Sequence, residues 1–156
     1  SMIIQKQYKF YAAHLNEQLL DKCRNLHGHR YGLVCFFEVE RDGALSNLFG
    51  DFDDKIEPMI KGCYDHCFIV NREDPLYQTL LEHQEKHGEE FRMKVLDFPS
   101  TVENIAFQLF TEITEHGFRL NRLELRETDT SVIEYTREDW VADCRLDLKK
   151  QEKSSG

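Results

Sequence analysis

The sequence predicts an α+β fold in which a four-stranded antiparallel sheet carries two helices packed on one face, in the order ββααββ. Two long segments near the N-terminus alternate apolar and polar residues with the period of a half-buried strand. Two later segments place apolar residues at helical spacing, and two short alternating segments come last. With 156 residues the chain is the size of one domain, which we place over residues 2–150.

The first two strands are expected over residues 4–15 and 27–40. The even positions of the first strand share one face, which ends in His14. The odd positions of the second strand share one face, which begins with His27 and His29. A hairpin-like arrangement of the two strands therefore brings the three histidines together at one end of the sheet.

The first helix is expected to begin among the acidic residues of segment 51–54, with Pro58 in its first turn, and to end near residues 65–66. The strongly polar stretch of residues 72–97 is interpreted as an insertion with a surface helix around residues 76–86. The buried stripe of the first helix is predicted to consist of Ile56, Met59, Ile60 and Cys63.

The second helix is expected to begin at Ser100, because Ser100 and Glu103 form a capping-box pattern ahead of an apolar stripe. Two strands, residues 123–128 and 132–135, follow with a turn between them. Residues 137–156 form a charged C-terminal extension. A sheet this small has open edges, and association of subunits through those edges is a natural way to cover them.

The composition limits the classes of function. The net charge of −9 argues against binding of nucleic acid through a general electrostatic field. No apolar run approaches the roughly 18 residues that span a bilayer, and the N-terminus resembles no secretory signal, so a cytoplasmic protein without a membrane partner is expected. The five cysteines lack framework spacing and are expected to be reduced, with Cys63 and Cys67 as small buried side chains.

Three histidines form the main candidate site. His14, His27 and His29 would supply three nitrogen ligands to a metal and leave one coordination position open. Cys23 stands four residues before His27, where a bound metal would lower the pKa of its thiol and make it a candidate base. The plainer readings are a His-x-His pair without a ligand role and an incidental loop cysteine.

Two further places in the sequence suggest chemistry. Asp65 precedes His66, and a carboxylate can fix the tautomer of a histidine that transfers protons. A simple pair at a helix end is an equally good interpretation. Glu127 continues the apolar face of Leu123 and Leu125, and a carboxylate on an inward face needs a partner.

Together these pieces resemble the family of 6-pyruvoyltetrahydropterin and 6-carboxytetrahydropterin synthases, which have the tunnelling fold. The resemblance runs from about residue 10 to residue 135, and the order and spacing of its motifs make it specific. Tyr64 departs from the family pattern, which usually has Leu there. The motifs are Phe10-Tyr11-Ala12-Ala13-His14, Cys23 through His29, Asp51-Phe52, Asp65-His66, Ser100-Thr101-Val102-Glu103-Asn104 and Glu127-Thr128.

The resemblance implies that His14, His27 and His29 bind Zn²⁺ and that Cys23 is the proton-abstracting base. It also implies homo-oligomers, in which the sheets of a trimer close into a barrel and two trimers pair into a hexamer. The substrate pocket then lies between subunits. Such an assembly would cover the open sheet edges.

The resemblance further implies that His66, oriented by Asp65, is a second proton-transfer group. Glu127 is expected to anchor the pterin ring through its guanidine-like edge. Thr101 and Glu103 are expected to border the same pocket.

The interval between cysteine and histidines separates branches of the family. Three residues lie between Cys23 and His27, which looks like the bacterial 6-carboxy branch of queuosine and deazapurine biosynthesis. The implied reaction converts 7,8-dihydroneopterin triphosphate to 6-carboxy-5,6,7,8-tetrahydropterin, acetaldehyde and triphosphate. The alternatives are a 6-pyruvoyltetrahydropterin synthase, which leaves the three-carbon side chain attached, and a noncatalytic zinc- or pterin-binding module.

Overall fold

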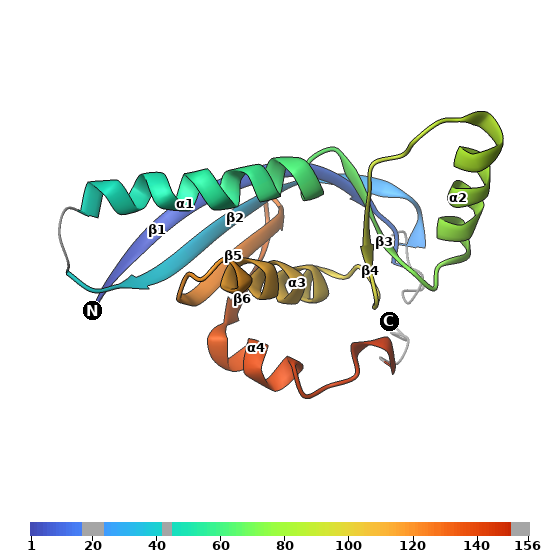
Figure 1. Cartoon of the computed structure of the whole chain (residues 1–156). Helices are drawn as coiled ribbons and strands as arrows, with labels where there is room; N and C mark the ends of the chain where they lie inside the picture. The colour runs from blue at the N-terminus through green and yellow to red at the C-terminus, as the bar shows by residue number, and fades with distance from the viewer. Residues whose placement is uncertain (17–23, 42–44, 151–156) are drawn as a thin grey trace.

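The computed structural model of the chain describes residues 1–16, 24–41 and 45–150 (Figure 1). Within these ranges no helix is long and apolar enough to cross a membrane. In chain order the elements are β1 (Met2–His14), β2 (His27–Val39), α1 (Leu45–Met59), the π-helical turn η2 (Ile60–Tyr64), β3 (Cys67–Asn71), α2 (Pro75–His87), β4 (Met93–Leu96), α3 (Val102–Glu115), β5 (Leu120–Thr128), β6 (Ser131–Thr136), α4 (Arg137–Asp143) and the 3-10 turn η3 (Leu148–Lys150).

The sheet has six strands in the order β4-β3-β1-β2-β5-β6, instead of the four that we predicted. The antiparallel pairs β1–β2, β2–β5 and β5–β6 confirm the expected central strands. The prediction missed β3 and β4, which add to the β1 edge in parallel orientation. The two strands have only five and four residues, and most of β3 is buried, so no period of two marks them in the sequence.

Strands β1 and β2 pair over their whole lengths, from Met2 opposite Val39 to His14 opposite His27. Along β1 up to Tyr11 the even positions are buried or half-buried and the odd positions are exposed. The even positions define the inner face of the sheet, and the odd positions define its outer face. This register places His14 and the histidines of β2 on the inner face, as the sequence predicts.

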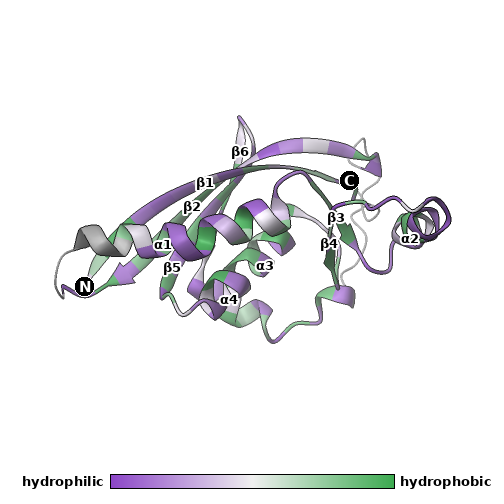
Figure 2. Ribbon diagram, turned by 45° about the horizontal axis from the view of Figure 1, so that its top comes forward, coloured by the Kyte–Doolittle hydropathy of each residue, from purple (hydrophilic) through white to green (hydrophobic). Residues whose placement is uncertain are grey.

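Helices α1 and α3 pack on the inner face of the sheet, and α4 lies beneath α3 (Figures 1 and 2). The ring of Phe52 in α1 stacks on Phe37 of β2 with centroids 4.2 Å apart. In the C-terminal extension, Trp140 stacks on Phe110 of α3 at 5.2 Å, which anchors the extension to the core. Helix α2 stands apart from the core and has no buried side chain, in agreement with a surface helix.

The first helix differs from its prediction at both ends. Helix α1 begins at Leu45, and Pro58 lies in its last turn and not in its first. Pro58 has no N–H for the helical ladder, and the regular helix ends one residue later and passes into the π-helical turn. Tyr64 takes the inward position at the end of that turn, so Cys63 is exposed, contrary to the predicted buried stripe.

The start of α3 is also corrected. Thr101, not Ser100, occupies the N-cap position, and its side chain makes no capping bond. The hydroxyl of Ser100 instead donates to the carbonyl of Leu15 at 3.2 Å. The loop before α3 is thereby tied to the end of β1, directly beside His14.

Candidate metal centre and active site

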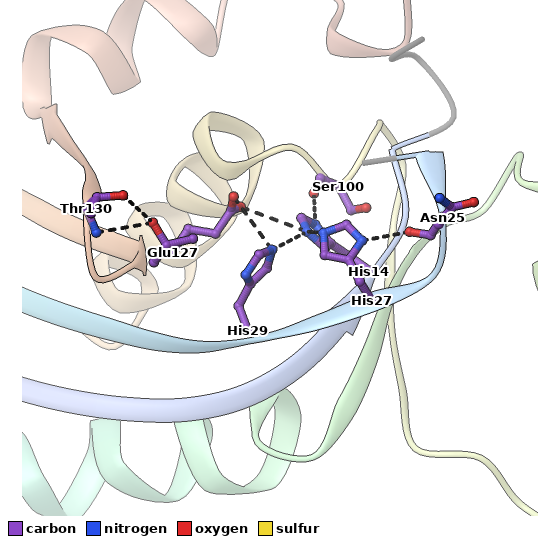
Figure 3. A network of polar contacts seen from close by, with 8 residues as sticks. His14, Asn25, His27, His29, Ser100, Glu127 and Thr130 are labelled. Carbon is purple, nitrogen blue, oxygen red and sulfur yellow. Dashed lines mark hydrogen bonds and ion pairs between the residues drawn. The ribbon is translucent and has the colours of Figure 1, made fainter. Parts of the chain in front are cut away.

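The ring nitrogens of three histidines converge at one end of the inner face. The Nε2 atom of His14 lies 3.0 Å from Nε2 of His27 and 3.1 Å from Nε2 of His29. These atoms form the one group of potential metal ligands found among the described residues. Figure 3 shows the three rings pointing toward one another from the ends of β1 and β2.

Two backbone carbonyls fix the orientation of the rings. Nδ1 of His14 lies 2.8 Å from the carbonyl oxygen of Ser100, and Nδ1 of His27 lies 2.6 Å from that of Asn25. A carbonyl oxygen only accepts, so each Nδ1 carries the proton and donates it. In the neutral rings, Nε2 of His14 and Nε2 of His27 therefore present lone pairs to each other, which is the arrangement of metal-ligating histidines with outer-shell carbonyl partners.

The facing lone pairs on the two Nε2 atoms repel each other, and protonation of His14 to remove this repulsion is unfavourable. Burial lowers the pKa of His14 from its ordinary value to about 4, and burial also lowers the pKa of His29. A metal cation suits the site better. Zinc bound tetrahedrally by nitrogen at about 2.0–2.1 Å places its ligand atoms roughly 3.3 Å apart, close to the observed spacing. The residues therefore fit a zinc ion held by three imidazoles.

Glu127 of β5 extends its carboxylate toward the same point. Its oxygens lie 3.7 Å from Nε2 of His29 and 3.9 Å from Nε2 of His14 (Figure 3). Burial raises the pKa of Glu127, and the nearby carboxylate of Glu103 raises it further, while His27 opposes the shift. Glu103 thus lies within electrostatic reach of Glu127.

The buried hydroxyls of Tyr31 and Thr101 make no hydrogen bond within the described parts of the chain. The Tyr31 hydroxyl lies within electrostatic reach of Glu127. Thr101 follows Ser100, whose carbonyl contacts His14. The Tyr31 ring packs edge-on against His29 at 5.6 Å, and burial together with Glu127 raises the pKa of its hydroxyl above the ordinary value. Unsatisfied buried donors are rare in proteins, and they mark places where a ligand or water is expected.

Asp65 and His66 form the second predicted pair. Nδ1 of His66 lies 2.9 Å from an Asp65 carboxylate oxygen, and the other oxygen accepts the backbone N–H of Tyr11 at 2.9 Å. The Tyr11 N–H is the main reason that the pKa of Asp65 lies below its ordinary value. The carboxylate is thus held ionised beside an imidazole, as a histidine that transfers protons requires.

The two halves of the candidate site lie on opposite faces of one sheet. The ring of His66 lies 5.9 Å from that of Tyr11, an outer-face position, and its side chain is 75% exposed. It borders an apolar groove of about 720 Å³ on the outer face, into which Leu76, Leu80 and Phe91 also project. The histidine triplet and Glu127 are on the inner face. Cys23 lies outside the described residues.

No sequence pattern reveals the groups that orient the histidine rings. Ser100 and Asn25 act through backbone carbonyls, which any residue could supply, so no pattern of side chains marks them. The buried hydroxyl of Tyr31 was also missed. Its place on the histidine face, two residues after His29, was the available signal.

Comparison with known proteins gives a consistent picture. The family model described as 6-pyruvoyl tetrahydropterin synthase matches residues 3–138. The chain is 31% identical over 141 residues to the 6-carboxy-5,6,7,8-tetrahydropterin synthase of Haemophilus influenzae, covering 85% of this chain and 96% of that protein. It is 33% identical over 136 residues to the protein of the same name from Aquifex aeolicus, covering 78% and 80%.

Solved structures share the fold. An uncharacterized protein from Wolinella succinogenes superposes with a TM-score of 0.63 at 25% identity, over 88% of this chain and 99% of that one. A 6-pyruvoyl tetrahydropterin synthase from Plasmodium vivax superposes with a TM-score of 0.56 over the same shares, at 17% identity. The second likeness concerns the fold alone.

Proposed function

The chain belongs to the 6-pyruvoyl tetrahydropterin synthase family, and on this basis we propose that it is a zinc-dependent 6-carboxy-5,6,7,8-tetrahydropterin synthase. The proposed reaction takes up water and converts 7,8-dihydroneopterin triphosphate to 6-carboxy-5,6,7,8-tetrahydropterin, acetaldehyde and triphosphate. Its product would enter queuosine and other deazapurine biosynthesis in the cytoplasm. The relatives from Haemophilus influenzae and Aquifex aeolicus carry this enzyme name, which supports the choice of branch.

The observation that carries the proposal is the convergence of three imidazole Nε2 atoms beside the Glu127 carboxylate. A structural zinc site is normally closed by four protein ligands. Among the described residues the group of mutually close donor atoms consists of three imidazoles and does not include the Glu127 carboxylate. The Tyr31 ring packs against His29, and its buried hydroxyl has no hydrogen-bond partner there. That surplus of polar groups favours a site that binds a substrate over a noncatalytic zinc module.

Zinc held by His14, His27 and His29 would supply Lewis acidity toward the side-chain oxygens of the substrate. Glu127 is suited to accept hydrogen bonds from the guanidine-like edge of a pterin, because its carboxylate is half-buried and, among the described residues, only histidine nitrogens lie within ion-pair distance of it. Thr101 and Glu103 would border the ring. Cys23, four residues before His27, would remove a proton from the side chain as a thiolate.

We propose that the proton-transfer group His66 reaches the metal centre from a neighbouring copy of the chain. In its own subunit His66 is on the outer face, behind the sheet from the histidine triplet. Strand β1 pairs with β3 only at Ala12 and Ala13, so most of that edge of β1 has no strand partner among the described residues. We propose that homo-oligomers, trimers or hexamers, bring the Asp65–His66 pair of one subunit to the metal centre of the next.

The close alternative is a 6-pyruvoyltetrahydropterin synthase, which the description of the family model favours. Both reactions would use the same metal ligands and the same carboxylate, so the residues described here do not separate them. The three-residue interval after Cys23 favours the 6-carboxy product.

Product analysis tests the proposal. Zinc-loaded protein incubated with 7,8-dihydroneopterin triphosphate is expected to release acetaldehyde and triphosphate in equal amounts, together with a 6-carboxy pterin detected by mass spectrometry. Protein stripped of metal is the control and should release neither. Triphosphate without acetaldehyde would establish the 6-pyruvoyl alternative, and an unchanged substrate would contradict both lyase assignments.

A further inference from the structure

A buried polar network lies directly behind the Asp65–His66 pair. The Tyr64 side chain is fully buried, and its hydroxyl donates a hydrogen bond to the Glu112 carboxylate of α3. The second oxygen of Glu112 accepts a hydrogen bond from Lys94 of β4. The Lys94 ammonium also lies 4.9 Å from the centroid of the Tyr64 ring. The Glu112 side chain thereby joins three elements that are far apart in the sequence: η2, β4 and α3.

His66, two residues after Tyr64, has an uncommon backbone conformation. His66 has φ of 59°, and no other non-glycine residue in the described ranges has a positive φ. The left-handed region is uncommon for a residue with a Cβ atom, because that atom comes close to the following carbonyl oxygen. Histidine adopts it more often than most such residues, but at single positions that the surrounding contacts stabilise. The structure around His66 must therefore hold it in place.

Two backbone hydrogen bonds do so, one made by His66 itself and one made by Asp65. The backbone N–H of His66 donates to the carbonyl of Tyr11 at 2.6 Å, and the N–H of the same Tyr11 donates to the Asp65 carboxylate. The Asp65 N–H donates to the carbonyl of Ile60 at 2.9 Å and closes the π-helical turn. Tyr64 is the last residue of the π-helical turn and directly precedes Asp65, so its position sets the point from which the Asp65–His66 segment leaves the core.

The core contacts of the Tyr64 ring are less directional than the hydrogen bond of its hydroxyl. Its ring lies 5.5 Å from that of Phe10 in the core, and aromatic contacts of this kind tolerate sliding and tilting. The bond to Glu112 fixes the far end of the ring. Burial and the neighbouring carboxylate raise the pKa of the Tyr64 hydroxyl well above its ordinary value, so it remains a donor, and Lys94 supplies the charge that balances Glu112.

We infer that Tyr64 is a positioning residue for the reaction, held by Glu112 and Lys94, and that it sets the orientation of the His66 imidazole. The inference rests on the proposed proton-transfer role of His66. Tyr64 touches no substrate in this account. Its hydroxyl acts on the site through the backbone of the next two residues.

Tyr64→Phe, which removes only the hydroxyl, tests the inference. Misplacement of a catalytic group by about 1 Å can lower the rate up to about 100-fold, so we expect kcat to fall by about tenfold while KM stays within about twofold. Imidazole ¹⁵N spectra should show a smaller population of the Nδ1–H tautomer at His66, because its contact with Asp65 is loosened.

Tyr135→Phe is the matched control. The Tyr135 hydroxyl also donates to a carboxylate, that of Asp143, at 2.5 Å, and the residue is likewise buried. It lies in β6, away from the π-helical turn. A purely structural role for Tyr64 predicts that both variants lose stability and that neither changes kcat or the His66 spectrum when assayed well below its melting temperature. That result would overturn the inference.

Variants of Glu112 provide the second arm. Glu112→Gln combined with Lys94→Met keeps an oxygen acceptor for the Tyr64 hydroxyl while removing both charges, and kcat should stay within about twofold of the wild type. Glu112→Leu combined with Lys94→Met removes the acceptor and should reproduce the loss seen in Tyr64→Phe. Equal kcat values for the two double variants would contradict the role of the hydrogen bond.

The spectroscopic measurement keeps this inference separate from the proposed function. If the wild type does not turn over dihydroneopterin triphosphate, the proposed function fails, and the His66 tautomer in Tyr64→Phe still decides the positioning role. An unchanged tautomer population in that variant overturns the inference whatever the enzyme catalyses.

Discussion

His14→Ala is expected to lose tightly bound zinc and, with it, turnover. His14 is fully buried, and its Nε2 atom contacts the Nε2 atoms of both other histidines. Loss of an outer-shell partner of a ligand lowers metal affinity by about 10–100-fold, and loss of this central ligand should exceed that range. Zinc per chain, measured after dialysis against a weak chelator, is expected to fall from about one to near zero.

His83→Ala is the control for this experiment. His83 lies on the exposed helix α2, where its ring nitrogen pairs with Glu89 at 3.1 Å. Its loss should leave zinc content and turnover unchanged. Full zinc occupancy in His14→Ala would remove His14 from the ligand set and with it the geometric basis of the proposed metal centre.

Cys23→Ala is expected to keep zinc and fold and to lose turnover by about 10²–10⁴-fold, the usual contribution of a general base. The prediction rests on the sequence, because Cys23 stands close to His27 but lies outside the described residues. A thiolate near a zinc ion is stabilised by the positive charge, and an alanine there can neither take up nor release a proton.

Cys144→Ala is a suitable control, since Cys144 is a free, exposed cysteine after helix α4. Both variants should bind one zinc per chain and unfold at temperatures close to that of the wild type. A Cys23→Ala protein that turns over at a near-normal rate would require another base for the reaction.

The paired histidines could be predicted from sequence because strand periodicity is a local property. Alternation along β1 and β2 fixed the faces, and a full-length hairpin register set His14 opposite His27. Glu127 followed from the same alternation in β5, where Leu123 and Leu125 are fully buried. The alternation of apolar and polar residues with a period of two therefore predicts which face of the sheet each of these side chains occupies.

Other features depend on contacts that no local pattern encodes. Ser100 looked like a helix cap, but its hydroxyl and carbonyl are used by Leu15 and His14 from another part of the chain. Strand β3 was missed because its pairing with β1 covers two residues. The place of His66 on the outer face follows from the π-helical turn and its backbone bond to Tyr11, which sequence spacing does not reveal.

In the proposed enzyme, three imidazoles hold a zinc ion at the end of the β1–β2 pair. Diffraction data collected on either side of the zinc absorption edge, from crystals of the protein as purified, test it most directly. We predict one strong anomalous peak per chain, about 2.0–2.1 Å from Nε2 of His14, His27 and His29. A peak elsewhere, for example at Cys63 and Cys67, or no peak in zinc-supplemented crystals, would contradict the account.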